Sequence, residues 1–355
     1  MLRLKAISLV TLVVVLFSLV GCGAADVTET PTEPGPTATE EPTEEPTEEP
    51  TEEPTEEPTP TQVTQADLVI GMSVHANPAE DSFWAVVERG AMDAAEVYGI
   101  ELNSGGSSDP TEQAQLVETF VSQEVDGIIV SLANPDALQD AVTSAVDAGI
   151  PVITINSGVD VYKEFGAMTH VGQTEVVAGE GAGEEFNELG LTNVLCVIHE
   201  EANIGLEQRC DGLENTFDGE VERFNVATTG TRDIAGTLAS IQDKLTADEA
   251  IDGVLSLNPD IAMAAYDAIQ AVDGGVTLAT FDLSPDVLEA ISEGEIAFAV
   301  DQQQYLQGYL PVVFLYLNNV NLNTVGGGRP VLTGPGFVTQ ENAAGVIDLA
   351  EQGTR

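Results

Sequence analysis

Short apolar runs alternate with longer amphipathic stretches between residues 67 and 355. The runs are continuously apolar, which is typical of β-strands buried on both faces of a parallel sheet. We expect strands at 68–74, 127–132, 151–155, 193–199, 221–227, 252–257 and 276–281. We expect helices at 82–98, 136–148, 204–217, 234–245, 260–272 and 285–292. Strands spaced by helices in this way predict an α/β fold with parallel, doubly wound sheets.

The number of strands is larger than one compact lobe would hold, so the pattern predicts two Rossmann-like α/β lobes. In such sheets, ligands bind in the crevice where the carboxyl ends of strands meet the N-termini of helices. We therefore look for candidate binding residues directly after the expected strands.

The first residues have the pattern of an export signal. Arg3 and Lys5 precede an uncharged, apolar stretch that ends in Leu19-Val20-Gly21-Cys22. This arrangement predicts a signal peptide over residues 1–21, and the apolar stretch is short for a membrane span. The tetrapeptide also resembles the lipobox of bacterial lipoproteins, which implies that Cys22 becomes lipidated. The alternative is an ordinary signal with an incidental cysteine. Either way we expect an exported protein, anchored to the outer face of the cytoplasmic membrane or located in the periplasm.

Residues 22–66 have a different composition. The motif Glu-Glu-Pro-Thr repeats every four residues from Glu40 to Thr59, with almost no large apolar side chain nearby. Such a segment buries too little apolar surface to offset the entropy of ordering it, and its charges and prolines keep it extended. We expect a disordered acidic tether.

The charge of the chain is strongly negative, with 60 acidic against 10 basic side chains and a net charge of −50 at pH 7. This excess argues against nucleic acid and anionic lipid headgroups as partners, since both require a positive surface. Thirteen of the acids lie in the tether, so 47 acids and only eight lysines and arginines remain between residues 67 and 355. We expect most of these acids on the surface, an arrangement suited to high salt.

The order of motifs resembles a known family. The first set is Asp67–Ser73, Ser82-Phe83-Trp84, Val125–Val130 and Gly149–Asn156. The second set is Arg209-Cys210-Asp211-Gly212, Leu257-Asn258, Thr280-Phe281-Asp282 and Asp301-Gln302. Together they resemble the type I periplasmic solute-binding proteins, the ribose- and galactose-binding group.

The resemblance implies that the chain crosses between the lobes three times, which creates a hinge and a cleft that closes on a small solute. It implies an amino-terminal lobe of 67–172 with 303–327 and a carboxy-terminal lobe of 173–302 with 328–355. It also implies that the solute passes to a membrane permease driven by an ATPase.

A sugar or polyol has apolar ring faces and a rim of hydroxyl groups, so its site needs aromatic surfaces and planar polar groups. Phe83 and Trp84, the only tryptophan, begin the first expected helix and are candidate aromatic contacts. As neighbours on a helix they point about 100° apart, so one of them could belong to the core.

Polar candidates follow the expected strands. Asn156, Asn258 and Asp282 each end a strand, although each could instead cap a helix or form a turn. Asp282 is the strongest of them, because the resemblance implies a buried carboxylate that accepts two sugar hydroxyls. Gln302 follows a strand matched to the third crossover, where the family has a polar ligand contact; its alternative role is a hinge hydrogen bond.

Weaker candidates are Ser131 after a strand, His75 and Asp81 in the first loop, and Arg232. A surface histidine is the alternative for His75. The chain also departs from the ribose-binding pattern: Glu207 stands where the family often has a ligand-binding arginine, and Arg209 matches a second arginine whose usual role is structural. We therefore expect neither ribose nor an anionic sugar acid, although Arg232 could supply one charged contact.

Two cysteines remain after Cys22, namely Cys196 on a strand and Cys210 on the helix that follows. In an exported protein they could form a disulfide that closes a loop of about 15 residues, or remain as two buried thiols. The three histidines, His75, His170 and His199, have no metal-ligand spacing with these cysteines, so no metal is expected.

No nucleophile with an activating base and no glycine-rich phosphate loop is evident, so we expect neither an enzyme nor a cofactor. The Gly179–Gly183 stretch instead indicates close packing. The sequence thus predicts a monomeric, lipid-anchored receptor that binds a monosaccharide or polyol and delivers it to an ABC permease. The alternative is a sensory or chemotactic receptor for a sugar-like, nucleoside or autoinducer ligand.

Overall fold

The computed structural model describes residues 67–226, 230–272 and 275–355. The expected signal peptide, Cys22 and the tether lie outside these residues. Contacts divide the chain into two units, Met1–Pro60 and Thr61–Arg355, and all the described residues belong to the second unit.

The described residues form two sheets of six strands. The first has the order β11-β5-β4-β3-β1-β2 and is parallel throughout. Its strands are β1 (Val69–Val74), β2 (Glu101–Gly106), β3 (Gly127–Ser131), β4 (Val152–Ile155), β5 (Thr169–Gly172) and β11 (Val331–Leu332). The second has the order β12-β10-β9-β8-β6-β7, and only its edge strand β12 is antiparallel. Its strands are β6 (Asn193–Ile198), β7 (Glu220–Asn225), β8 (Gly253–Ser256), β9 (Thr277–Phe281), β10 (Phe298–Asp301) and β12 (Gly336–Thr339).

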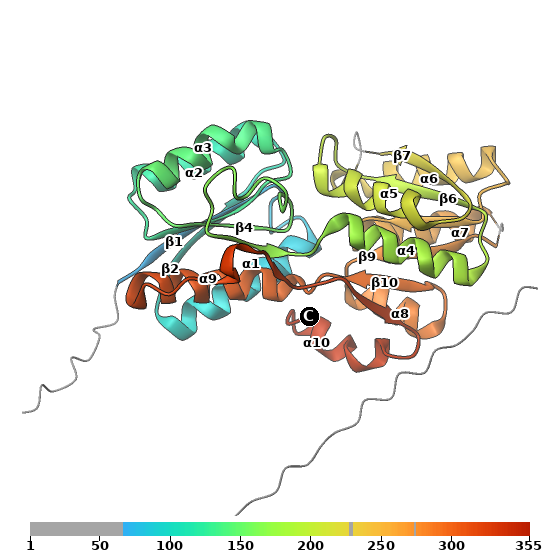
Figure 1. Cartoon of the computed structure of the whole chain (residues 1–355). Helices are drawn as coiled ribbons and strands as arrows, with labels where there is room; N and C mark the ends of the chain where they lie inside the picture. The colour runs from blue at the N-terminus through green and yellow to red at the C-terminus, as the bar shows by residue number, and fades with distance from the viewer. Residues whose placement is uncertain (1–66, 227–229, 273–274) are drawn as a thin grey trace, which may run out of the picture. The chain divides into compact units, whose positions relative to one another are not determined.

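Helices cover both faces of each sheet (Figure 1). In the first lobe, α1 (Ser82–Tyr98) and α9 (Gln304–Asn321) pack on one face, and α2 (Pro110–Ser122) and α3 (Pro135–Asp147) on the other. In the second lobe, α4 (Glu175–Leu189) and α5 (Ile204–Thr216) share one face. The opposite face carries α6 (Ile234–Ala247), α7 (Pro259–Val272), α8 (Pro285–Glu293) and α10 (Ile347–Glu351). The two α/β lobes expected from the hydrophobic pattern are thus confirmed.

Within the described residues, the chain passes between the lobes at three places: Gln173 after β5, Gln302 and Gln303 between β10 and α9, and 333–335 between β11 and β12. Two expectations need correction here. The last boundary, expected after residue 327, lies after Leu332, because β11 pairs with β5 of the first sheet. Gln302 lies on the second crossing rather than the third.

Two crossing segments are bonded to each other. Thr333 Oγ1 donates to the Gln302 carbonyl at 2.7 Å, and Gln307 Nε2 donates to Gln302 Oε1 at 2.8 Å. Gln302 therefore belongs to a hydrogen-bonded hinge. A hinge hydrogen bond was the alternative to a ligand contact that the sequence suggested for this residue.

Helices α4 and α5 touch through their backbones. A Cβ atom added at Gly179 would lie 2.1 Å from the Arg209 carbonyl oxygen, and one at Gly212 would lie 2.1 Å from that of Val176. The close packing expected from the glycine-rich stretch is confirmed, and it fixes how near α5 lies to α4.

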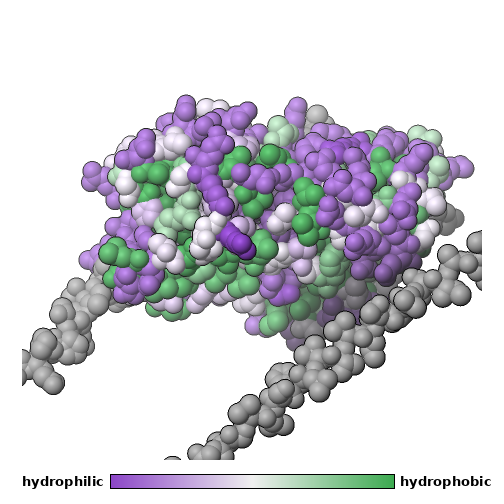
Figure 2. Space-filling model, in the orientation of Figure 1, coloured by the Kyte–Doolittle hydropathy of each residue, from purple (hydrophilic) through white to green (hydrophobic). Residues whose placement is uncertain are grey.

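Polar residues dominate the face of the molecule shown in Figure 2, with apolar residues in scattered areas between them. Among the helices of the described residues, none has the length and hydropathy to cross a bilayer.

Candidate functional site

A small pocket lies at the carboxyl ends of both sheets. Eight of the residues singled out from the sequence line it, namely His75, Asp81, Phe83, Trp84, Asn156, Asn258, Asp282 and Gln302. They come from both lobes and from the second crossing segment, as expected for polar groups that follow parallel strands.

The aromatic wall comes from the start of α1. Asp81 caps this helix by accepting a hydrogen bond from the Trp84 amide at 3.1 Å. The rings of Phe83 and Trp84 meet edge to face with centroids 5.0 Å apart, and Trp84 meets His75 in the same way at 4.8 Å. Both aromatic residues pack in the first-lobe core and also line the pocket.

A line of polar groups crosses the floor of the pocket. Asn156 Nδ2 donates to Gln302 Oε1 at 3.1 Å, and Gln302 Nε2 donates to Asp282 Oδ1 at 2.8 Å. Asn156 and Asp282, which follow β4 and β9, have φ angles of 59° and 71°. Left-handed backbone is uncommon for residues other than glycine and often marks functional positions. The line joins one residue of each lobe through the hinge.

Arg209 is the permanent cation among the residues that line the pocket. Its Nε donates to Glu175 Oε2 at 2.7 Å, its Nη1 donates to the Leu257 carbonyl at 3.0 Å, and Nη1 lies 3.7 Å from Asp282 Oδ2. Burial lowers the pKa of Arg209, but Glu175 and Asp282 outweigh that effect and the net shift is upward. The positive charge is therefore already balanced by protein carboxylates.

Burial shifts the acids and histidines toward their neutral forms. It raises the pKa of Asp282 to about 7, against the opposing effects of Arg209 and Gln302. It raises the pKa of Asp81 to about 7, and Glu200 and Asp260 add to the rise. Burial also lowers the pKa of His75 to about 3 and that of His199 to about 4. Near pH 7 the pocket thus offers neutral imidazoles and carboxyls that can accept or donate hydrogen bonds.

The two lobes touch across the pocket. His75 Nε2 lies 3.3 Å from Asn203 Nδ2 and 3.6 Å from Glu200 Oε2. Nearby, the Ile204 amide donates to the Ala133 carbonyl at 3.1 Å. The structure is therefore a closed form, and His75, expected on the surface if it had no ligand role, is buried in this contact.

Two expected ligand residues do not line the pocket. Ser131 lies behind His75, with its Oγ 2.8 Å from His75 Nδ1 and accepting from the His75 amide at 3.0 Å. It can orient the imidazole but does not reach the void. Arg232 borders an open hollow that adjoins the pocket and shares His75, Asp81, His199 and Glu200 with it. The other walls of this hollow include Glu80, Glu112 and Glu201.

Several lining residues were not predicted from the sequence, among them Ser157, His199, Glu200, Asn203 and Arg209. His199 and Glu200 directly follow β6. A search for polar residues directly after strands, which identified Asn156, would therefore also have identified these two. Arg209 was expected to have a structural role alone; it has that role and also faces the pocket. Glu207 pairs with Arg223 at 2.7 Å instead of facing the pocket.

In the part of the chain that the structure describes, no group of three or more His, Cys, Asp or Glu side chains is placed to hold a metal ion. The arrangement is that of a binding site: aromatic faces, fixed hydrogen-bonding groups and a cleft between two lobes.

Comparison with solved structures gives a carbohydrate transporter protein from Acidothermus cellulolyticus 11B in complex with myo-inositol. It is 39% identical, has a TM-score of 0.79 and matches 81% of this chain and 99% of its own. A solute-binding protein from Bacillus halodurans C-125 with bound myo-inositol is 26% identical, has a TM-score of 0.70 and matches 81% of this chain and 99% of its own.

Among curated proteins, xylose/arabinose-binding protein XylF of Sulfolobus acidocaldarius is 27% identical over 73% of this chain and 68% of its own length. Ribose import binding protein RbsB of Haemophilus influenzae is 25% identical over 70% of this chain and 84% of its own. The model of the periplasmic binding protein domain matches residues 70–318. The chain therefore belongs to the periplasmic binding protein domain family, whose members bind solutes and are not enzymes.

Proposed function

We propose that this protein is the extracytoplasmic receptor that captures a monosaccharide or cyclic polyol and delivers it to an ABC permease. The observation that carries the proposal is the polar line Asn156–Gln302–Asp282, which lines the same pocket as the aromatic pair Phe83 and Trp84. Hydroxyl groups on a ring match the polar line, and a ring face matches the aromatic wall.

The charges favour a neutral solute. Arg209 is already paired with Glu175 and Asp282, whereas Asp81 and Glu200 also line the pocket. A carboxylate or phosphate on the solute would approach these acids without a free cation to compensate it. The relative that is 39% identical was solved with myo-inositol, a neutral ring of hydroxyls, so inositol is the first candidate.

We further propose that Cys22 carries a lipid and that the Glu-Glu-Pro-Thr segment spaces the receptor from the membrane. The support is the lipobox-like tetrapeptide at the end of the apolar stretch. Mass spectrometry of the mature N-terminus tests this: a diacylglyceryl adduct on Cys22 is expected, and a mature terminus without a lipid adduct would contradict it.

A thermal-shift panel of pentoses, hexoses, inositols, sugar acids and sugar phosphates tests the binding function. Because a ligand bound only by the folded state raises Tm, one neutral class should raise it in a concentration-dependent way. The matched charged compounds should give little or no shift. If no neutral polyhydroxyl compound stabilised the protein, the proposed function would be wrong.

A further inference from the structure

A disulfide closes a covalent ring around one wall of the pocket. Cys196 on β6 is bonded to Cys210 on α5, with a sequence separation of 14 and a Cα–Cα distance of 6.1 Å. Both cysteines are fully buried. The pocket residues inside this ring are His199, Glu200, Asn203, Gly205, Leu206 and Arg209. The ring therefore contains most of the second lobe's contribution to the site.

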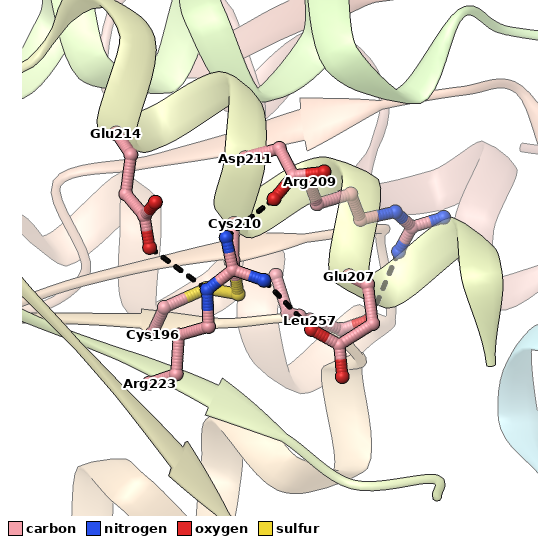
Figure 3. Close-up of a disulfide and its surroundings, with 8 residues drawn as sticks. All are labelled: Cys196, Glu207, Arg209, Cys210, Asp211, Glu214, Arg223 and Leu257. Atoms are coloured by element: carbon pink, nitrogen blue, oxygen red, sulfur yellow. Dashed lines mark hydrogen bonds and ion pairs between the residues drawn. A yellow bond between two sulfur atoms is a disulfide. The ribbon is translucent and has the colours of Figure 1, made fainter. Parts of the chain in front are cut away.

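An ion-pair cluster ties the same helix to the next strand. Arg223 of β7 contacts three acids along one side of α5: Glu207 at 2.7 Å, Glu214 at 2.8 Å and Asp211. Figure 3 shows these contacts beside the disulfide. Helix α5 is thus attached to β6 by a covalent bond and to β7 by ion pairs.

Arg209 depends on where this helix lies. It directly precedes Cys210, and its guanidinium group reaches Glu175 of α4 and the Leu257 carbonyl after β8. Hydrogen bonds weaken steeply when the donor moves or tilts. A small displacement of α5 would therefore change which Arg209 and Asn203 atoms face the solute.

We propose that the Cys196–Cys210 disulfide and Arg223 are positioning residues for solute binding, holding α5 so that Arg209 and Asn203 are in place before the solute arrives. This inference rests on the proposed function. Neither the disulfide nor Arg223 lines the pocket. Any effect of these groups on affinity therefore acts through the pocket residues of α5 and its N-cap, such as Arg209 and Asn203. A wall that is ordered in advance loses less entropy on binding, which strengthens affinity.

The test compares three variants with the wild type by isothermal titration calorimetry, with myo-inositol, xylose and ribose as titrants. The variants are Cys196→Ala/Cys210→Ala, Arg223→Gln and, as control, Arg89→Gln. Arg89 forms an exposed ion pair with Asp93 on α1, remote from this wall. Titrations are run at a temperature where near-ultraviolet circular dichroism shows every variant folded.

We expect Kd to rise roughly three- to tenfold in the disulfide-free variant, by a smaller factor in Arg223→Gln, and to stay unchanged in Arg89→Gln. A purely structural role would lower Tm and leave Kd unchanged. Should the disulfide-free variant be unfolded, Arg223→Gln, which keeps the disulfide, decides the question alone. An unchanged Kd in the folded variants would overturn this inference only. Absence of binding of every neutral polyhydroxyl compound of the thermal-shift panel by the wild type would overturn the proposed function and this inference with it.

A second readout separates positioning from general loosening. Asn203→Ala removes one pocket side chain inside the ring, and its effect on Kd is measured with and without the disulfide. If the disulfide positions Asn203, the substitution should weaken binding less in the disulfide-free protein, because the side chain is already misplaced there. If Asn203→Ala raised Kd by the same factor with and without the disulfide, the proposal would be contradicted.

Discussion

At the scale of single residues, Asp282 combines the features of a ligand-binding group. It follows β9 with a φ of 71°, accepts from Gln302 Nε2 at 2.8 Å and lies 3.7 Å from Arg209 Nη1. Burial raises its pKa to about 7, so a fraction is protonated at neutral pH. Solute hydroxyls that donate to the ionised carboxylate would shift that balance.

Asp282→Asn tests this role. Because only the carboxylate accepts from two hydroxyls, the variant should bind at least about tenfold more weakly. In the wild type, affinity should rise from pH 6 to pH 8, by up to about tenfold if Asp282 alone governs it. Calorimetric titrations at both pH values should show a smaller rise in the variant. An identical pH dependence in the two proteins would exclude Asp282 as the titrating group.

His170 concerns stability rather than binding. It is fully buried on β5 with Nδ1 2.9 Å from Thr154 Oγ1, and burial lowers its pKa to about 3. The unfolded chain therefore binds a proton near pH 6.5 that the folded protein binds only near pH 3. This histidine contributes stability above pH 6.5, and that contribution is lost as the pH falls toward 3.

Urea unfolding of the wild type and of His170→Gln at pH 7 and pH 5 measures this contribution. Between pH 7 and pH 5, the free energy of unfolding should fall by about 2 kcal/mol more in the wild type than in the variant, because only the wild type has a histidine here that gains a proton on unfolding. The other titrating groups contribute equally to the pH dependence of both proteins, so their effects cancel in the comparison. Parallel losses in the two proteins would show that His170 titrates normally in the fold.

At the scale of helices and strands, the elements that present the site depend on close backbone contacts. Gly179 and Gly212 let α4 and α5 touch, which places Glu175 of α4 beside Arg209 of α5. Any side chain at either glycine would push the helices apart. The pair Glu175–Arg209 is fully buried, so such a shift would leave charges poorly paired.

Gly212→Ala should therefore lower the free energy of unfolding by roughly 1–3 kcal/mol, as overpacked cores do. Gly345→Ala is the matched control, because a Cβ there meets no atom within 4 Å. Urea denaturation of both variants checks the difference. Equal stability would mean that the helices can separate without cost.

The hydrophobic pattern predicted most elements but not all. It found β1, β3, β4, β6, β8 and β9, which lie inside the sheets and are largely apolar. It missed two other interior strands, β5 and β10, although all their residues are buried. It missed β2 (Glu101–Gly106), a polar edge strand with no fully buried residue, and with it the following helix α2. It also missed α4, since glycines at 179, 181 and 183 weaken the helical signal while serving the close packing.

The site residues were predictable to a similar degree. Strand ends predicted Asn156, Asn258 and Asp282, because parallel strands point their carboxyl ends at one edge. Arg209 was not predicted as a lining residue, since its direction depends on how α5 packs against α4 and β6. Ser131 ends a strand, as the predicted site residues do, yet it lies behind His75 and does not line the pocket. The local sequence does not show which strand-end side chains reach the pocket.

At the scale of the whole molecule, the acids and the binding site are separate features. The folded part carries 47 acids against eight lysines and arginines. Arg209, Arg223, Lys244 and Arg355 are engaged in ion pairs with acids, so the remaining acids repel one another across the surface. Salt screens this repulsion over about 10 Å at 0.1 M.

Stability should therefore increase with ionic strength. Differential scanning fluorimetry in NaCl between about 0.01 and 1 M, a range over which the Debye length falls from about 30 to 3 Å, should show Tm rising. Sodium chloride and potassium chloride should act alike if screening is the cause. A Tm that is independent of salt, or that falls, would show that the surface acids do not destabilise the fold.

We propose that a neutral polyhydroxyl ring binds between the two lobes against Trp84. Since Trp84 is the only tryptophan and lines the pocket, its fluorescence reports on this site alone. Titration of the wild type with myo-inositol, xylose and ribose should give a saturable change with one of them at one solute per protein, and Asp282→Ala should abolish it. No saturable change with any of these solutes, or an equal change in Asp282→Ala, would contradict binding of an inositol or a pentose in this pocket.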